Sequence, residues 1–127
     1  MKRAIILALL AITPAYAVQG PLKCKYEVDI HCDVVDKRIF VNSVTLNPGN
    51  CEDPIELANK LNKIRDDFIV KHPEQSQFAS PFIKDYRREH VFGDRLEIKV
   101  QSQCNLLEFT VTVDGKPYTW RVHDNGK

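Results

Sequence analysis

The C-terminal stretch from Arg95 to His123 alternates between apolar and polar residues in three successive runs. Alternation with a period of two is typical of a strand that has one buried face, and turn-forming residues separate the runs. Asp114-Gly115, between the second and third runs, is a strong signal for a two-residue hairpin. The stretch therefore predicts a three-stranded antiparallel meander, which restricts the chain to folds built on a half-buried sheet.

One choice of register places the apolar residues of this meander on a single face. A shift by one residue would move them all to the opposite face, so this register is strongly favoured. The predicted rungs are Leu96-Val111-Tyr118, Ile98-Phe109-Trp120 and Val100-Leu107-Val122. Because Pro117 lacks an amide hydrogen, the strand that contains it is predicted to lie at an edge.

The N-terminus has the three parts of a secretory signal peptide. Met1-Lys2-Arg3 is basic, Ala4–Ile12 is almost wholly aliphatic, and Ala15-Tyr16-Ala17 fits a cleavage site. The apolar run is shorter than the roughly 20 residues that a membrane span requires. We therefore expect residues 1–17 to be a signal peptide and residues 18–127 to be the mature protein, located in a bacterial periplasm or outside the cell.

The mature part is expected to form a single domain. The leader holds 17 residues, two of them basic, so 110 residues with a net charge of −1 remain of a chain whose net charge is +1. A chain of this length builds one modest core. Its near-neutral charge provides no field that would attract nucleic acid, so no nucleic-acid partner is predicted.

All four cysteines lie in the mature part. An even number of cysteines in a small exported domain indicates disulfide bonds, and the sequence lacks the close Cys pairs of a zinc site. The sequence therefore predicts two disulfides, no metal and no cofactor.

The disulfide pairing follows from the predicted N-terminal strands. The stretch from Cys24 to Val34 alternates throughout, which predicts one continuous strand paired with a second strand over Ile39–Leu46. On such a strand Cys24 and Cys32 would lie roughly 26 Å apart at about 3.3 Å per residue, too far to form a disulfide. The hairpin register brings Cys24 close to Cys51, so we predict the pairs Cys24–Cys51 and Cys32–Cys104.

A helix is predicted between Asp53 and Pro73. Asp53 is a favourable N-cap, Pro54 suits the first helical position, and Pro73 ends the helix. Leu57, Leu61, Ile64 and Phe68 recur at helical spacing and form an apolar stripe. The stripe is expected to pack on the sheet.

These elements predict an α+β fold. An antiparallel sheet, made of the N-terminal hairpin and the C-terminal three-strand meander, packs on one amphipathic helix and is braced by two disulfides. The alternative is a sandwich in which the N-terminal hairpin packs over the meander and the helix is an insertion.

Two histidines are candidates for chemistry. His31 lies between Asp29 and Asp33 on one strand face, and His90 could serve a serine such as Ser80. Ligands from one strand do not close a metal site, and no nucleophile motif accompanies His90. No catalytic residue is therefore assigned. His31 is expected to lie on a solvated strand face, and His90 belongs to the segment before the meander.

The long segment before the meander is the predicted interaction surface. It is rich in aromatic residues and arginine, which often anchor protein interfaces. The candidate binding residues are Phe78, Phe82, Tyr86, Arg87, Arg88 and His90. The structural alternative is that the aromatic residues fill a small core under a long loop.

The sequence thus favours a small exported, non-enzymatic domain that binds another protein, as an inhibitor, an immunity factor or a secreted effector. One alternative is a small-molecule carrier with a pocket between helix and sheet, lined by Phe68, Tyr118 and Trp120. The other is a small hydrolase that uses His31 or His90. No membrane span is predicted in the mature chain.

Overall fold

The computed structural model describes residues 12–14, 17–47 and 51–122. Its strands are β1 (Ile12–Pro14), β2 (Ala17–Gln19), β3 (Leu22–Glu27), β4 (Asp29–Val34), β5 (Arg38–Asn47), β6 (Glu89–Val91), β7 (Arg95–Ile98), β8 (Glu108–Val113) and β9 (Lys116–Arg121). The main helix is α2 (Pro54–Lys71), and the short 3-10 helix η1 (Pro73–Phe78) follows it. Most of the predicted leader, residues 48–50 and the end of the chain from His123 lie outside the described residues.

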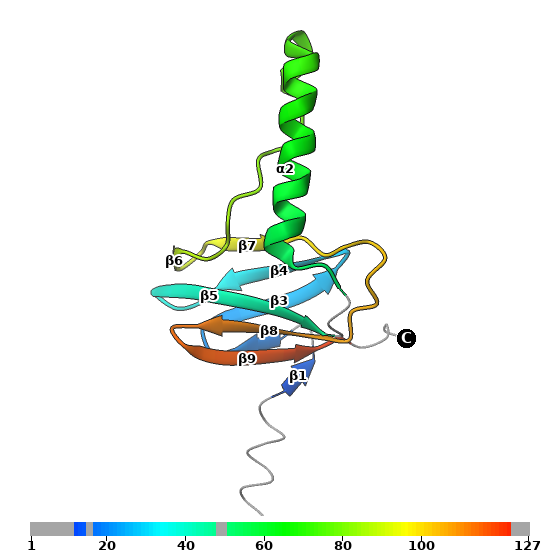
Figure 1. Ribbon diagram of the computed structural model, residues 1–127. Coiled ribbons are helices and arrows are strands. Elements are labelled where there is room, and N and C mark those ends of the chain that lie inside the picture. Colours follow the sequence, from blue (N-terminus) through cyan, green and yellow to red (C-terminus); the bar gives the residue numbers. More distant parts are fainter. Residues whose placement is uncertain (1–11, 15–16, 48–50, 123–127) are drawn as a thin grey trace, which may run out of the picture.

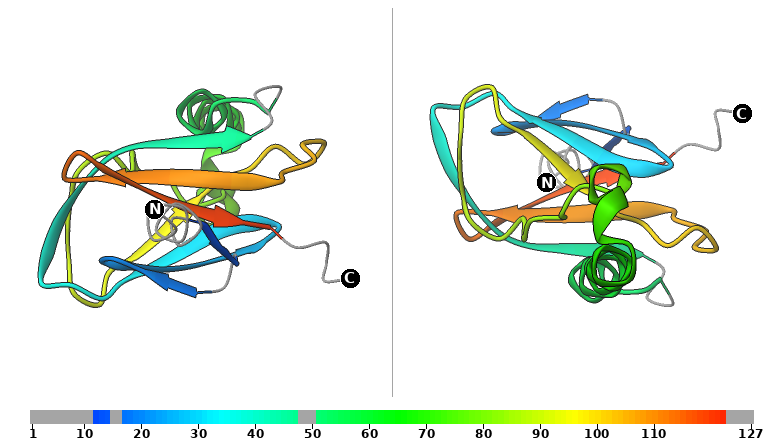
Figure 2. Two further views of the ribbon diagram at one scale, coloured as in Figure 1. Left: turned by 90° about the horizontal axis from the view of Figure 1, so that it is seen from below. Right: turned by 90° about the horizontal axis from the view of Figure 1, so that it is seen from above.

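The strands form two sheets that face each other as the layers of a sandwich (Figure 1, Figure 2). One sheet has the order β1-β9-β8-β5-β6, and the other has the order β2-β3-β4-β7. Neighbouring strands are antiparallel, except that β1 runs parallel to β9. The predicted α+β class, with antiparallel sheets, one main helix and two disulfides, is confirmed. The sheets form a sandwich, but its strands are divided differently from the sandwich alternative, because β5 lies beside β8 and β7 lies beside β4.

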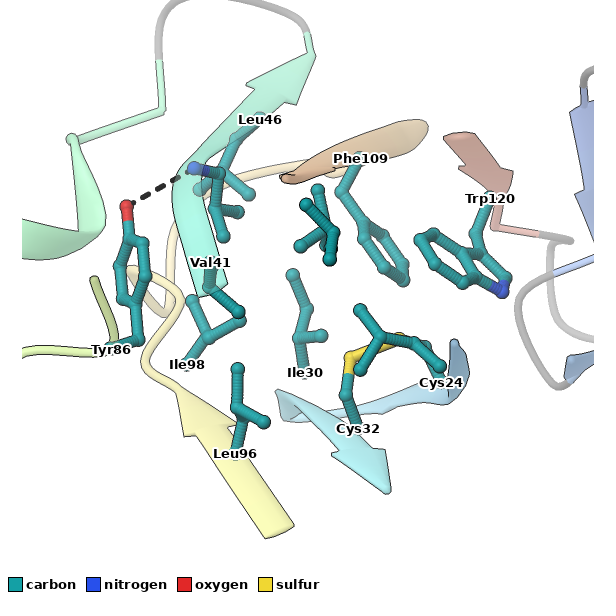
Figure 3. Close-up of a cluster of buried hydrophobic side chains, with 14 of the residues drawn as sticks. Cys24, Ile30, Cys32, Val41, Leu46, Tyr86, Leu96, Ile98, Phe109 and Trp120 are labelled. Carbon is teal, nitrogen blue, oxygen red and sulfur yellow. Dashed lines mark hydrogen bonds between the residues drawn. A yellow bond between two sulfur atoms is a disulfide. The ribbon is translucent and has the colours of Figure 1, made fainter. Parts of the chain in front are cut away.

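Inward-pointing side chains of both sheets fill the space between the layers (Figure 3). In β4 the residues Ile30, Cys32 and Val34 are buried, while their neighbours are only partly covered, as a strand with one inner face requires. From the other sheet, Phe109 stacks on Trp120 with ring centroids 5.4 Å apart. Both rings are fully buried.

The predicted strand from Cys24 to Val34 is in fact two strands. Val28 has a left-handed backbone with φ 66° and separates β3 from β4, which pair as a tight hairpin. The alternating pattern conceals this turn, because residues that pair across the hairpin still share one face. The predicted pairing of this segment with Ile39–Leu46 is therefore wrong, since β5 pairs with β8 and β6 instead.

Because of the same turn at Val28, the predicted disulfide pairs Cys24–Cys51 and Cys32–Cys104 are wrong. Cys24 and Cys32 lie directly opposite each other in the hairpin, with Cα atoms 4.1 Å apart, and they form a disulfide. The other disulfide joins Cys51 to Cys104. The predicted pairs assumed an unbroken strand, and the distance argument fails once the chain reverses at Val28.

The predicted meander is half confirmed. β8 and β9 pair in the predicted register, with Phe109 opposite Trp120, and both Asp114 and Gly115 at their turn have positive φ values of 50° and 81°. By contrast, β7 belongs to the other sheet, where it pairs with β4. The apolar side of β7 faces the core from either sheet, so the pattern could not distinguish the two positions.

Helix α2 begins as predicted. The side chain of Asp53 accepts hydrogen bonds from the amides of Ile55 and Glu56, at 3.0 and 3.2 Å. The helix then projects away from the edge of the sandwich (Figure 1), and its buried residues, Pro54 and Ala58, belong to its first turns.

The expectation that the whole apolar stripe lies on a sheet is therefore corrected. Leu61 is 37% exposed and Ile64 is 65% exposed. The two sheets already cover each other's apolar faces, so the helix finds no open sheet face on which to bury its stripe.

Replacing Phe109 by Ala tests the position of the core. We expect the free energy of unfolding to fall by about 3–5 kcal/mol, because a large buried side chain leaves a cavity. The matched control is Leu107→Ala, close by in the chain, whose side chain is 55% exposed. It should change stability by less than about 1 kcal/mol. Urea denaturation followed by circular dichroism measures both, and similar losses in the two variants would contradict this core.

Candidate functional site

The structure separates the six predicted binding residues into three pairs. Phe78 and Phe82 are 74% and 56% exposed and lie beside helix α2. Arg87 and Arg88 are exposed near the rim of the first sheet, while Tyr86 and His90 are buried. The six residues therefore do not form one surface.

Tyr86 and His90 close the open edge of β5. The Tyr86 hydroxyl accepts a hydrogen bond from the amide of Val44 at 3.2 Å (Figure 3). The amide of Val41 donates to the carbonyl of Arg88 at 3.1 Å. These bonds satisfy backbone groups of β5 where β6 does not reach them, so the segment from Tyr86 to His90 protects a sheet edge.

The ring of His90 is held in one orientation. Its Nε2 lies 2.9 Å from the carbonyl oxygen of Tyr86. A carbonyl only accepts, so Nε2 carries the hydrogen. Nδ1 is buried and has no hydrogen-bond partner among the described residues. With 2% of its surface exposed, His90 is not placed to meet a substrate or a partner.

Arg87 and Arg88 both form hydrogen bonds to Asp85 in the same loop. Arg87 forms hydrogen bonds to both carboxylate oxygens of Asp85, at 2.8 to 3.2 Å. These bonds from Arg87 lower the pKa of Asp85 below its usual value. Arg88 donates from Nε to the carbonyl oxygen of Asp85 at 3.2 Å. Both side chains remain exposed and can contact a partner without leaving the loop.

The segment after helix α2 folds back along the helix and is fastened to it. The side-chain amide of Asn62 donates to the carbonyl of Ile83 at 2.9 Å and accepts from its amide at 2.8 Å. Arg65 donates from Nε to the carbonyl of Ser80 at 2.9 Å, and its guanidinium carbon lies 5.8 Å from the centre of the Phe82 ring. Helix and segment thus form one protruding unit.

An apolar groove runs between the helix and this segment, and we call it the helix–loop groove. Its lining residues are Leu61, Ile64, Arg65, Phe68, Phe78, Ala79, Ser80, Pro81, Ile83, Glu97 and Lys99. Its volume is about 460 Å³. Most of these residues are aliphatic or aromatic, and the charged ones are Arg65, Glu97 and Lys99.

Leu61, Ile64 and Phe68 are the groove residues that sequence reasoning assigned to the core. Their spacing predicts an apolar helix face correctly, but it does not reveal what covers that face. The length of the helix could have indicated that part of its apolar face is not covered by a sheet. Its 18 residues span roughly 27 Å at about 1.5 Å per residue, so the helix can extend beyond the edge of a small sandwich.

His31 lies on a ladder of polar and charged pairs on the outer face of the second sheet. As predicted, Asp29, His31 and Asp33 share one face of β4, and each of them meets a residue of β7 or of the chain just after it. Asp33 accepts from Arg95 at 2.9 Å, His31 Nδ1 lies 3.4 Å from Glu97, and Asp29 lies 3.3 Å from Lys99. The carboxylates are thus paired across strands instead of converging on His31.

The predicted ligand pocket, lined jointly by Phe68, Tyr118 and Trp120, is not formed by these residues. Trp120 is fully buried between the sheets, and its ring lies towards the end of the core away from Tyr86 and the helix (Figure 3). Phe68 lines the helix–loop groove instead. Phe68 and Trp120 therefore belong to different parts of the molecule.

Comparisons of the chain with protein-family models, with curated proteins and with solved structures return no match. Within the part of the chain that the structure describes, no helix has the length and apolar character needed to cross a membrane. In those same residues, no three His, Cys, Asp or Glu side chains are grouped so that they could hold a metal ion. What the chain does has to be inferred from its own surfaces.

The burial of Tyr86 leads to a test by pH. Burial raises the pKa of the Tyr86 phenol, and the hydrogen bond from Val44 opposes this only in part. The folded state therefore holds the proton more tightly than the unfolded state, whose tyrosines have a pKa of about 10. The resulting stabilisation is complete below about pH 10 and is lost as the pH rises through the folded-state pKa.

The variant Tyr86→Phe should reveal this effect. At about pH 8 it should be less stable than the wild type by about 1–3 kcal/mol, because the Val44 amide loses its acceptor. The variant has no proton to lose, so the difference should shrink at about pH 11. Urea denaturation at both pH values measures this, and a constant difference would show that Tyr86 does not titrate in a buried site.

Proposed function

We propose that this chain is an exported, non-enzymatic domain that binds another protein through its helix–loop groove. The observation that carries the proposal is the apolar face of α2 and the segment after it, which projects from the sandwich and remains exposed. Ile64, Phe78 and Phe82 are 65%, 74% and 56% exposed. Exposed aromatic and aliphatic side chains around a hollow are typical of protein interaction sites.

The groove suits a particular kind of partner. Its apolar walls favour an amphipathic helix or an extended apolar segment that places one or two side chains between Phe68 and Phe78. Arg65, one of the lining residues, is held by Ser80 and Phe82, and its Nη1 pairs with the carboxylate of Asp66 at 2.8 Å. A carboxylate of the partner beside the apolar anchor would share this guanidinium with Asp66.

Export is part of the same proposal. The two disulfides and the lack of a membrane-spanning helix among the described residues are consistent with a periplasmic or extracellular protein. The basic, apolar and small-residue pattern of residues 1–17 supports removal of a signal peptide after Ala17. The intact mass of protein recovered from the periplasm of an expressing bacterium tests this, and it should correspond to a chain that begins at Val18.

A small-molecule carrier is the second candidate. The groove volume of about 460 Å³ lies within the range of ligand sites, which is about 300–1,000 Å³. Native mass spectrometry of the purified protein would reveal a retained ligand. A ligand displaced by Phe78→Ser would favour this candidate over protein binding.

Capture experiments with matched variants test the main proposal. Crosslinked complexes from periplasmic and host fractions should be recovered at least about tenfold less with Ile64→Glu or Phe78→Ser, because each change removes an apolar anchor. Both side chains are exposed, so the variants should keep the wild-type melting temperature. The control is Leu107→Ser, which removes a 55% exposed side chain outside the groove. Equal recovery with all of these chains would contradict binding at the groove.

A further inference from the structure

The edge of strand β9 is covered by residues that the export proposal removes. Ile12, Thr13 and Pro14 of β1 lie opposite Thr119, Trp120 and Arg121 in parallel register. In Figure 1, β1 lies at the edge of the sandwich beside β9, opposite to the end from which α2 projects. This edge is therefore separate from the helix–loop groove.

The hydrogen-bond pattern between β8 and β9 shows which backbone groups of β9 are available at this edge. The Val122 amide donates to the Leu107 carbonyl, so the pair formed by these two residues is a hydrogen-bonded pair. Such pairs alternate along an antiparallel ladder, so Trp120 also directs its backbone groups towards β8. The amide and carbonyl groups of Thr119 and Arg121 consequently face away from β8, towards the position that β1 occupies.

Cleavage after Ala17 would remove a second interaction. The indole Nε1 of Trp120 donates to the carbonyl oxygen of Ala17 at 2.9 Å, and Trp120 is fully buried. A buried donor without an acceptor costs about 1–3 kcal/mol. Processing would thus leave the core with an unpaired indole N–H next to an open strand edge.

We propose that the edge of β9 in the processed chain accepts an extended strand from a partner protein, running parallel to β9 where β1 runs in the full chain. The proposal rests on the cleavage that is part of the proposed function. The incoming residue beside Trp120 shares the inner face with it and has to be uncharged. The residue beside Arg121 points outwards, where a carboxylate is favoured by the guanidinium.

The remaining backbone of this edge is compatible with a parallel strand. In a parallel ladder, the residue opposite Trp120 donates to the carbonyl of Thr119 and accepts from the amide of Arg121. The side-chain amide of Gln19, which stays in the processed chain, also donates to the Thr119 carbonyl. This bond does not block the position, because a carbonyl has a second lone pair for the incoming strand.

A second copy of the chain fits this edge less well. In an antiparallel pairing of two β9 strands about Thr119, Arg121 of one copy would lie opposite Pro117 of the other. Pro117 offers no amide hydrogen to such a ladder. A parallel strand needs only the groups of Thr119 and Arg121, which are free of this conflict.

Hydrogen exchange read residue by residue tests the proposal with the full chain and the processed chain that begins at Val18. The amides of Thr119 and Arg121 should exchange about tenfold or more faster in the processed chain, because they have lost a neighbouring strand. A synthetic peptide of residues 12–17 with an amidated C-terminus is the probe. It should restore slow exchange and change the fluorescence of Trp120.

Two matched controls define the interaction. The same peptide with a methyl group on the Thr13 nitrogen lacks the central donor and should restore no protection. A Pro14→Asp peptide should bind the wild-type chain more tightly than the unmodified peptide, and an Arg121→Glu chain should reverse that preference. Arg121 is exposed, so its replacement leaves the fold intact.

Each other outcome overturns the inference. If the edge amides stay protected in a monomeric processed chain, the edge is closed by the chain itself. If light scattering shows that the processed chain is a dimer with protected edge amides, a second copy occupies the edge. Equal binding of the methylated peptide means that no strand is added. A periplasmic protein that still carries residues 1–17 would contradict the proposed cleavage after Ala17, on which this inference rests, whereas the other results leave protein binding at the groove untouched.

Discussion

The space between the two sheets is the constraint on which the rest of this structure depends. Every second residue of the facing strands points into it, and the Phe109–Trp120 stack and the Cys24–Cys32 disulfide lie there together (Figure 3). Because the two sheets bury their apolar faces against each other, neither sheet has an apolar face left on which a helix could pack. The position of α2 outside the core follows from this pairing.

A helix that is excluded from the core retains its apolar face. Asp53 and Pro54 start the helix beside the sandwich, and the burial of Ala58 fixes its first turns. Beyond that point Asn62 and Arg65 bind the returning segment, not a sheet. The result is a projection with an apolar groove, whose exposed side chains have no structural role in the core. This combination is why the groove is the best candidate for a binding surface.

The backbone groups at the open edges of the first sheet are covered in two different ways. At β5, the hydroxyl of Tyr86 and the carbonyl of Arg88 satisfy backbone groups, and these belong to the mature domain. At β9, the covering strand belongs to the predicted leader. An edge that is permanently closed cannot add a strand, whereas an edge covered by a removable segment can. The helix–loop groove and the β9 edge, which are the two proposed sites, thus lie at opposite ends of the sandwich (Figure 1).

The sequence by itself determined the local structure. Asp53 and Pro73 bounded the helix, Asp114-Gly115 set the β8–β9 hairpin and its register, and alternation identified which residues point inwards, because these signals act between near neighbours. Only the tertiary structure decided that Val28 reverses the chain, which strand pairs with which, how the cysteines join, and that Tyr86 and His90 are buried while Leu61 and Ile64 are exposed. An apolar face has the same pattern whatever covers it, so its partner depends on contacts between residues far apart in the chain.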